Sequence, residues 1–423
     1  MRTLTDSGTI ETESSLKMGI ILAAPERCGI HGRMFFMINS ELRRASPDVT
    51  THFNFQDLMT AHEQGQPIGD AQMSLIAGDA SDRKFYRLAS AQLNAICMKF
   101  PKWEGGYGGD PMSWLGMQAA LLGVGIPVPR ILHIDEKNSC IWTEDFGDQF
   151  LNYKLGERTL DESDADCRAT LQLYKDALNL LVKVQYPEKK LIHHPAENRS
   201  FDFEKLMFEM NFFITHFVKG WLGQNLETSN ARTDELTEEL GTLCTLLHET
   251  ERVLCHRDYH VRNVMVVGGQ VRWIDFQDAR MGPHTYDVVS LLRDSYIRIT
   301  PETRISLTRH YGARLNDARQ NVGKKAWSNE MLFHEASLMG LQRNIKALGS
   351  FGYLATQKQK TGYLKYVPHT IETILADDFA KEAGMRIADA FPATIGFLTE
   401  LVQGSGKTHL ESKLRSYGVA ESF

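Results

Sequence analysis

The sequence predicts an α+β protein of two lobes, in which a small antiparallel sheet precedes a larger, mostly helical part. Between residues 71 and 145, short apolar runs alternate with turns, as expected of antiparallel strands. After Gly156, apolar residues recur at intervals of three and four, which indicates amphipathic helices. A third observation is the spacing of polar residues between Val253 and Arg293, which favours one particular chemistry in the helical part.

Composition excludes several classes of protein. A chain of 423 residues with 42% hydrophobic and 24% charged residues can bury the cores of two lobes. The net charge of −6 argues against a nucleic-acid partner, which would need a basic face. The six cysteines form no C-x-x-C pair, so we expect reduced thiols in a cytoplasmic protein. No apolar run reaches 18 residues, and we expect no membrane span.

The first lobe begins with three predicted strands, at residues 73–77, 84–88 and 93–100. A turn of small residues, G-D-A-S-D-R (78–83), joins the first two. A helix is expected at 112–122, and the prolines of G-I-P-V-P-R (125–130) prevent it from continuing. The stretch I-W-T-E-D-F-G-D (141–148) then predicts the strand and hinge that lead to the second lobe.

Long helices dominate the second lobe. Their apolar periodicity predicts them at residues 171–185, 201–218, 236–250, 330–348 and 363–375. Between the third and fourth of these helices, V-M-V-V (264–267), a Gly268-Gly269 turn and Q-V-R-W-I (270–274) predict a β-hairpin. This hairpin folds its two ends back beside each other.

Three acceptor side chains surround that hairpin. Asp258 lies in H-R-D-Y-H-V-R-N, Asn263 follows five residues later, and Asp275 follows after twelve more in W-I-D-F-Q-D. Phosphoryl transfer requires such a set, because one carboxylate orients the attacking hydroxyl while an amide oxygen and a second carboxylate hold Mg²⁺ on the nucleotide phosphates. We therefore predict Asp258 as the catalytic base, and Asn263 and Asp275 as metal ligands. Asp287, at the start of a predicted helix, is expected to support the loop by accepting backbone hydrogen bonds.

These residues carry a resemblance to a known family. H-R-D-Y-H-V-R-N followed by I-D-F-Q-D-A is similar to the catalytic and metal-binding loops of the aminoglycoside phosphotransferase branch of the protein-kinase-like superfamily. Three further stretches resemble bacterial N-acetylmuramate/N-acetylglucosamine anomeric kinases: G-D-A-S-D-R-K-F-Y-R-L (78–88), G-P-H-T-Y-D-V-V-S-L-L-R-D (282–294) and L-Q-R-N-I-K-A-L-G (341–349). The resemblance implies a two-lobed protein-kinase-like fold, with ATP and Mg²⁺ as cofactors.

The first lobe is then expected to bind the nucleotide. The turn with Gly78 and Ser81 can place backbone N–H groups over the phosphates, and the backbone near Glu144 can face the adenine. Lys99, at the end of the third strand, stands where such a lobe carries its phosphate-binding lysine. The helix at 112–122 has no acidic residue to pair with Lys99. Gln118, Glu104 or Asp110 are the alternatives considered for that partner.

Two function classes follow. The first is an ATP-dependent kinase that phosphorylates the anomeric hydroxyl of an amino sugar in cell-wall recycling, with an aminoglycoside or an amino alcohol as alternative acceptors. The second is a catalytically weak, nucleotide-binding regulatory protein. The resulting segments are an N-terminal extension that is partly disordered or in short helices (1–70), a nucleotide-binding lobe (71–145), a helical catalytic lobe (146–400) and a flexible tail (401–423).

Overall fold

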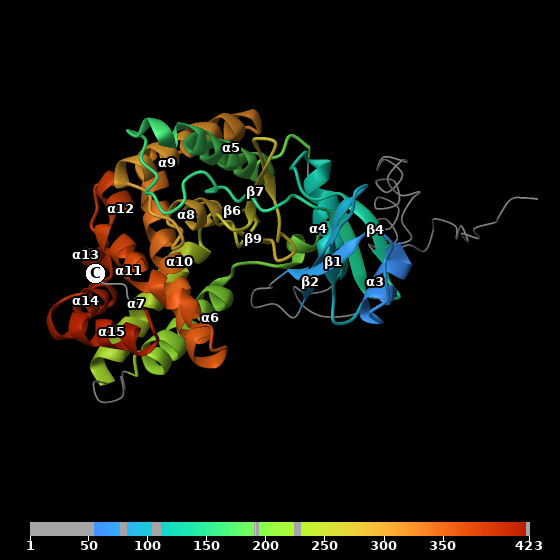
Figure 1. The fold of residues 1–423 in the computed structure, drawn as a ribbon. Helices are drawn as coiled ribbons and strands as arrows, with labels where there is room; N and C mark the ends of the chain where they lie inside the picture. The colour runs from blue at the N-terminus through green and yellow to red at the C-terminus, as the bar shows by residue number, and fades with distance from the viewer. Residues whose placement is uncertain are drawn as a thin grey trace, which may run out of the picture.

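The computed structural model describes residues 55–76, 83–103, 111–189, 191, 194–223 and 230–419. A small lobe built on one sheet lies at one end of the molecule, and a larger lobe of helices forms the rest (Figure 1). The predicted fold class is confirmed. The N-terminal extension falls outside the described residues as far as position 54, and its remainder contains one short helix, α3 (Phe55–Glu63).

The sheet of the small lobe is antiparallel, with strand order β1-β2-β3-β5-β4. Its strands are β1 (Gln72–Ile76), β2 (Lys84–Ala89), β3 (Asn94–Lys99), β4 (Ile131–Asp135) and β5 (Cys140–Glu144). The predicted strands are confirmed with small shifts of their ends. Register matters here, because successive residues of a strand point to opposite faces of its sheet.

A helix covers each face of this sheet. On the face that carries Met98 and Ile141, α4 (Pro111–Gly123) packs between the sheet and the large lobe. On the opposite face, Ala95 and Cys97 pack with Phe55 and Met59 of α3 in a separate apolar core. The two sides of β3 therefore belong to different environments.

The large lobe is helical apart from two short ladders. Its first helices are α5 (Arg168–Gln185), α6 (Phe203–Phe213), the π-helix η4 (Ile214–Trp221) and α7 (Asn230–His248). One ladder pairs β6 (Arg252–Cys255) with β9 (Arg280–Pro283), and the other pairs β7 (Val264–Val267) with β8 (Gln270–Trp273). The remaining helices are α8 (Tyr286–Leu292), α9 (Pro301–Asn321), α10 (Asn329–Gln357), α11 (Val367–Ala376), α12 (Asp378–Glu382), α13 (Ile387–Ala390), α14 (Pro392–Leu401) and α15 (Gly404–Ser416), with the 3₁₀ turn η6 (Thr361–Tyr366) before α11.

Helix α10 is the central element of this lobe and packs against α6, η4, α8 and α11. Two glycines permit its closest approach to the chain at α6 and η4. A Cβ at Gly349 would lie 2.8 Å from the Cα of Phe213, and one at Gly352 would lie 2.5 Å from the carbonyl oxygen of His216. Larger residues cannot occupy these positions without a backbone shift, so the glycines hold α10 at a fixed depth.

Two expectations are corrected by the structure. The predicted helix at 201–218 changes after Phe213 from α-helical to π-helical geometry. The segment 401–423 was expected to be a flexible tail, but residues 404–416 form α15, whose Leu410 and Leu414 are fully buried. Burial of this apolar pair outweighs the polar sequence around it. None of the described helices is long and apolar enough to cross a membrane.

Candidate active site

The loop after β6 carries Asp258, and a buried carboxylate supports it. Asp287, at the start of α8, accepts hydrogen bonds from the backbone N–H groups of His256 and Arg257 at 2.6 and 3.0 Å. Its predicted supporting role is confirmed. Arg257 has a positive φ of 82°, a conformation that costs free energy in a residue other than glycine. The two hydrogen bonds help to hold the loop in this strained form.

The β7–β8 hairpin brings the other two predicted residues beside this loop. The Asn263 amide nitrogen donates to the backbone oxygen of Asp258 at 2.9 Å and lies 3.4 Å from the Asp275 carboxylate. Asp275 also has a positive φ, 62°, two residues after the strand that ends at Trp273. The three residues predicted from their spacing therefore lie close together.

The oxygens of this site suit a hard divalent cation. Asp275 has a side chain that is 39% exposed, so its carboxylate is accessible to solvent. The described residues contain no group of three or more His, Cys, Asp or Glu side chains that could hold a metal ion by themselves. A cation that bridges nucleotide phosphates needs only one or two protein ligands, because the phosphates and water complete its shell. Asn263 and Asp275 fit that requirement.

Positive charge surrounds the Asp258 carboxylate. Burial by itself raises the pKa of Asp258, but the cations Lys346 and Arg257 outweigh this effect and hold the pKa below its ordinary value. The Nζ of Lys346, from α10, lies 3.7 Å from Asp258 Oδ1. Asp258 is therefore ionised at neutral pH and able to accept a hydrogen bond from a hydroxyl group.

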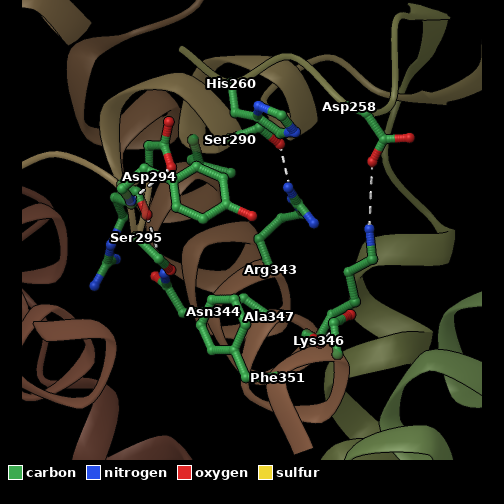
Figure 2. A pocket seen from close by; sticks show the side chains of 14 residues that line it. Asp258, His260, Ser290, Asp294, Ser295, Arg343, Asn344, Lys346, Ala347 and Phe351 are labelled. Atoms are coloured by element: carbon green, nitrogen blue, oxygen red, sulfur yellow. Dashed lines mark hydrogen bonds and ion pairs between the residues drawn. The ribbon is translucent and has the colours of Figure 1, made fainter. Parts of the chain in front are cut away.

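A cavity opens beside Asp258, between the catalytic loop and α10. Figure 2 shows Lys346 reaching toward Asp258, and Arg343 one turn earlier reaching toward Ser290. The Arg343 Nε donates to the Ser290 hydroxyl at 2.7 Å. Two cationic side chains of one helix therefore line this cavity beside Asp258.

An aromatic cluster lies close to this cavity and is occupied by the protein itself. The Arg262 guanidinium lies over the rings of Tyr296, Tyr363 and Tyr366, at 3.9, 5.7 and 5.8 Å from their centroids. Its Nη2 also donates to the Tyr366 hydroxyl at 2.9 Å. The aromatic faces that could otherwise receive a ligand cation are engaged by this arginine.

Comparison with known proteins agrees with this geometry. Residues 72–322 match the model of the phosphotransferase enzyme family, which is more than half of the chain. The chain belongs to this family. This phosphotransferase is therefore a nucleotide-dependent enzyme that acts on a hydroxyl group, and its family implies ATP and a divalent metal.

Relatives cover most of the phosphotransferase. It is 28% identical over 79% of its length to an N-acetylmuramate/N-acetylglucosamine kinase of Neisseria meningitidis, of which the match covers 92%. A kinase of the same name from Pseudomonas aeruginosa is 29% identical over 74% of this chain and 85% of its own. A choline kinase of Cryptosporidium parvum, 10% identical, has a similar fold with a TM-score of 0.52 over 81% of this chain and 99% of its own.

The predicted nucleotide-binding residues of the phosphotransferase that the structure describes do not lie together in the way that Asp258, Asn263 and Asp275 do. Gly78 and Ser81 lie outside the described residues. Glu144 ends β5, and its carboxylate forms an ion pair with Arg130 at 3.1 Å. Lys99 forms an ion pair with Glu63 of α3. Sequence reasoning did not identify Glu63 as a partner, because it precedes the first strand by nine residues.

Gln118, one of the three residues predicted as a partner of Lys99, has a different partner in the structure. Gln118 instead donates to the backbone oxygen of Pro129 at 3.1 Å, whereas Glu104 and Asp110 lie outside the described residues.

Sequence reasoning also did not identify Arg83, Arg343 and Lys346. Arg83 precedes β2 and forms an ion pair with Asp275 at 3.1 Å. A signal for Arg343 and Lys346 was present, since residues three apart on a helix lie on one face. The missing information was which face α10 turns toward the catalytic loop, and tertiary packing determines that.

Proposed function

We propose that this phosphotransferase uses ATP and Mg²⁺ to phosphorylate the anomeric hydroxyl of an amino sugar, N-acetylmuramate or N-acetylglucosamine. The names of its relatives support the sugar class. The observation that carries the choice of acceptor is the charge of the cavity beside Asp258. We expect the reaction to take place in the cytoplasm, where ATP is available, and to belong to the recycling of cell-wall sugars.

The cavity favours a neutral or anionic acceptor over a cationic one. Lys346 and Arg343 present positive charge directly beside Asp258. An aminoglycoside carries several ammonium groups and choline carries a quaternary ammonium, so both would be repelled by these cations. N-acetylmuramate carries a carboxylate on its lactyl group, which Arg343 and Lys346 can bind with charge-assisted hydrogen bonds. The ammonium acceptors are therefore the less suitable alternatives.

The aromatic cluster around Arg262 supports the same choice. A choline site depends on aromatic faces that surround the quaternary ammonium. Here the Arg262 guanidinium lies 3.9 Å from the centroid of Tyr296 and bonds Tyr366. Admission of choline would require the loss of this internal cation–π contact.

Each residue then has a distinct part in the reaction. Asp258 accepts the hydrogen bond of the anomeric hydroxyl and orients its oxygen toward the terminal phosphate. Asn263 and Asp275 would hold Mg²⁺, which offsets charge on the phosphates when it is bound. Asp287 keeps Asp258 in place through the loop backbone. The proton of the hydroxyl passes to Asp258 as the new oxygen–phosphorus bond forms, while the bond between the terminal phosphorus and its bridging oxygen breaks and ADP leaves.

The product distinguishes this proposal from other phosphotransferases. A sugar 1-phosphate has no free reducing end and is hydrolysed rapidly by mild acid, whereas a 6-phosphate keeps its reducing end and resists acid. The test supplies ATP and Mg²⁺ with a panel of amino sugars, aminoglycosides and amino alcohols, and reads the phosphorylated position by NMR. We expect acid-labile, non-reducing product from N-acetylmuramate or N-acetylglucosamine.

Other outcomes of this panel would contradict specific parts of the proposal. An acid-stable, reducing product would overturn the anomeric position and leave the phosphotransferase assignment intact. Preferred turnover of an aminoglycoside or of choline would overturn the argument from cavity charge. Nucleotide binding without turnover of any acceptor would favour the regulatory alternative.

A further inference from the structure

Lys99 of β3 is the residue predicted to bind the nucleotide phosphates, and the direction of its side chain tests that prediction. Odd-numbered residues of the strand share one face of the sheet with each other. Ala95 and Cys97 pack into the apolar core beneath α3, and Cys97 Sγ lies 4.0 Å from Met59 Sδ of that helix. Lys99 follows the same alternation and forms its ion pair with Glu63, at the end of α3.

The opposite face of β3 is the one turned toward α4 and the large lobe. Met98 lies on this face, in the core that also contains Trp114 of α4 and the catalytic lobe's Phe276. Trp114 and Phe276 are in ring contact, with centroids 5.3 Å apart, so this core joins the two lobes. The residue of β3 that faces the large lobe is therefore an uncharged methionine, while Lys99 faces away.

Arg83 supplies a positive charge at the place that Met98 leaves neutral. Its Nη1 lies 3.9 Å from Met98 Sδ, and its Nη2 lies 3.1 Å from Asp275 Oδ1. The side chain is only 8% exposed, although Asp275 is 39% exposed. A buried guanidinium therefore connects the sheet of the small lobe to Asp275, the predicted metal ligand of the large lobe.

We propose that Arg83, and not Lys99, is the side chain that binds the phosphates of the nucleotide. It comes from the end of the turn before β2 rather than from β3, and a guanidinium can hold two phosphate oxygens at once. Asp275 would hold the metal, and its negative charge, which Arg83 contacts in this structure, would then be offset by that cation. The guanidinium is then available to the phosphates beside that metal.

The other nearby cations of the described region have different partners. Arg257 pairs with Asp278 at 3.3 Å, and Lys346 lies against Asp258 at 3.7 Å. Arg87, four residues after Arg83 and within β2, binds Asp145 and Asp148 near the predicted hinge. Within the part of the chain that the structure describes, Arg83 is the cation in contact with Asp275.

The test compares two charge deletions by nucleotide affinity rather than by activity. Wild type, Arg83→Ala and Lys99→Met are titrated with ATP, ADP and AMP in the presence of Mg²⁺, by calorimetry. We expect Arg83→Ala to weaken ATP binding by about 10-fold to 100-fold, ADP binding by less and AMP binding by the least, because a charged hydrogen bond to phosphate is lost. Lys99→Met should change each affinity by less than about threefold, because an exposed ion pair contributes little.

Conservative variants separate phosphate binding from structural support. Arg83→Lys keeps one charge without the planar fork, so its ATP affinity should fall between those of wild type and Arg83→Ala. Arg83→Gln keeps most of the stem and carries the same test if Arg83→Ala does not fold. A purely structural role would lower the affinities of ATP, ADP and AMP by equal factors, and that result would overturn the proposal.

The Lys99→Met variant tests the alternative that Lys99 binds the phosphates. A loss of ATP affinity in this variant that equals or exceeds the loss in Arg83→Ala would return the role to Lys99. The inference rests on the proposed use of ATP, and the wild-type titration distinguishes the two failures. If wild type binds no nucleotide, the proposed function is wrong, whereas wild-type binding that is insensitive to Arg83 contradicts this inference alone.

Discussion

The loop that carries Asp258 and strand β3 differ in how well the sequence alone predicts where their side chains point. Around the loop, Asp258, Asn263 and Asp275 are close in the sequence, and the hairpin between them returns the chain to one place. On β3, a displacement of one residue exchanges Lys99 for Met98 on the face toward the large lobe. Spacing across a short hairpin locates side chains well, whereas the position of a charge on a strand does so only when its face is known.

Replacement of Asp275 should have the largest effect and tests the loop half of this comparison. Asp275→Ala removes a carboxylate from the metal site, so we expect activity to fall by about 10³-fold and Mg²⁺-dependent nucleotide binding to be lost. The measurement is ATP affinity with Mg²⁺ and with a chelator. Asp278→Asn is the matched control, because Asp278 pairs with Arg257 and should leave the difference between the two conditions largely intact. Unchanged Mg²⁺-dependent affinity in Asp275→Ala would exclude its role as a ligand.

Asp258→Asn should have the next largest effect and separates the base from the metal ligands. The amide has the same shape but is a poor acceptor for the proton of the hydroxyl, so we expect kcat to fall by about 10²-fold or more. Nucleotide affinity should remain nearly unchanged, because Asp258 acts on the acceptor. Steady-state kinetics and ATP titration of the same preparation measure both quantities. An equal loss of ATP affinity would contradict this division of roles.

Lys346→Met sharpens the comparison by testing a residue that neither spacing nor strand alternation identified. Loss of its charge should raise the KM for N-acetylmuramate by about 10-fold, because a charge-assisted contact to the carboxylate disappears. N-acetylglucosamine, which has no carboxylate, is the internal control for any general disturbance of Asp258. An equal change in the KM of both sugars would show that Lys346 does not bind the carboxylate of N-acetylmuramate.

The same residue gives a pH dependence with a definite sign. Burial and the charge of Arg343 lower the pKa of Lys346 to about 8. Lys346 is therefore cationic below this pH and loses its charge as the pH rises through it. We expect the KM for N-acetylmuramate to increase above about pH 8, with little change for N-acetylglucosamine. Lys346→Arg should remove this dependence, and its persistence there would assign the titration to another group.

The pair of Glu63 and Lys99 should give the smallest effect and tests the strand half of the comparison. The pair is partly exposed, with side chains that are 47% and 24% accessible. Breaking it by Glu63→Gln should lower the free energy of unfolding by about 0.2–1 kcal/mol. Urea denaturation of Glu63→Gln, Lys99→Met and the double variant measures their coupling. Additive changes in the cycle would mean that the ion pair contributes nothing to stability.

The sequence was sufficient for the fold class, for the proximity of Asp258, Asn263 and Asp275, and for the hydrogen bonds of Asp287 to the loop backbone. It was insufficient where distant segments meet. Glu63 comes from a helix that precedes the family match, and Lys346 reaches Asp258 across 88 positions of the chain. The burial of Leu410 in α15 depends on packing in the same way, since the polar residues around it predicted an unstructured tail.

The attachment of Lys99 to α3 has an evolutionary consequence. If Glu63 and Lys99 have no role besides their ion pair, selection acts on the pair and not on either residue alone. The two charges can then be swapped between the positions, or both can be lost together. Positions 83 and 275 do not have that freedom, because each would also have to satisfy a ligand. In divergent relatives, the residues at positions 63 and 99 should therefore change together, whereas those at positions 83 and 275 should stay the same. The direction in which a side chain of β3 points would then be visible in the pattern of substitutions.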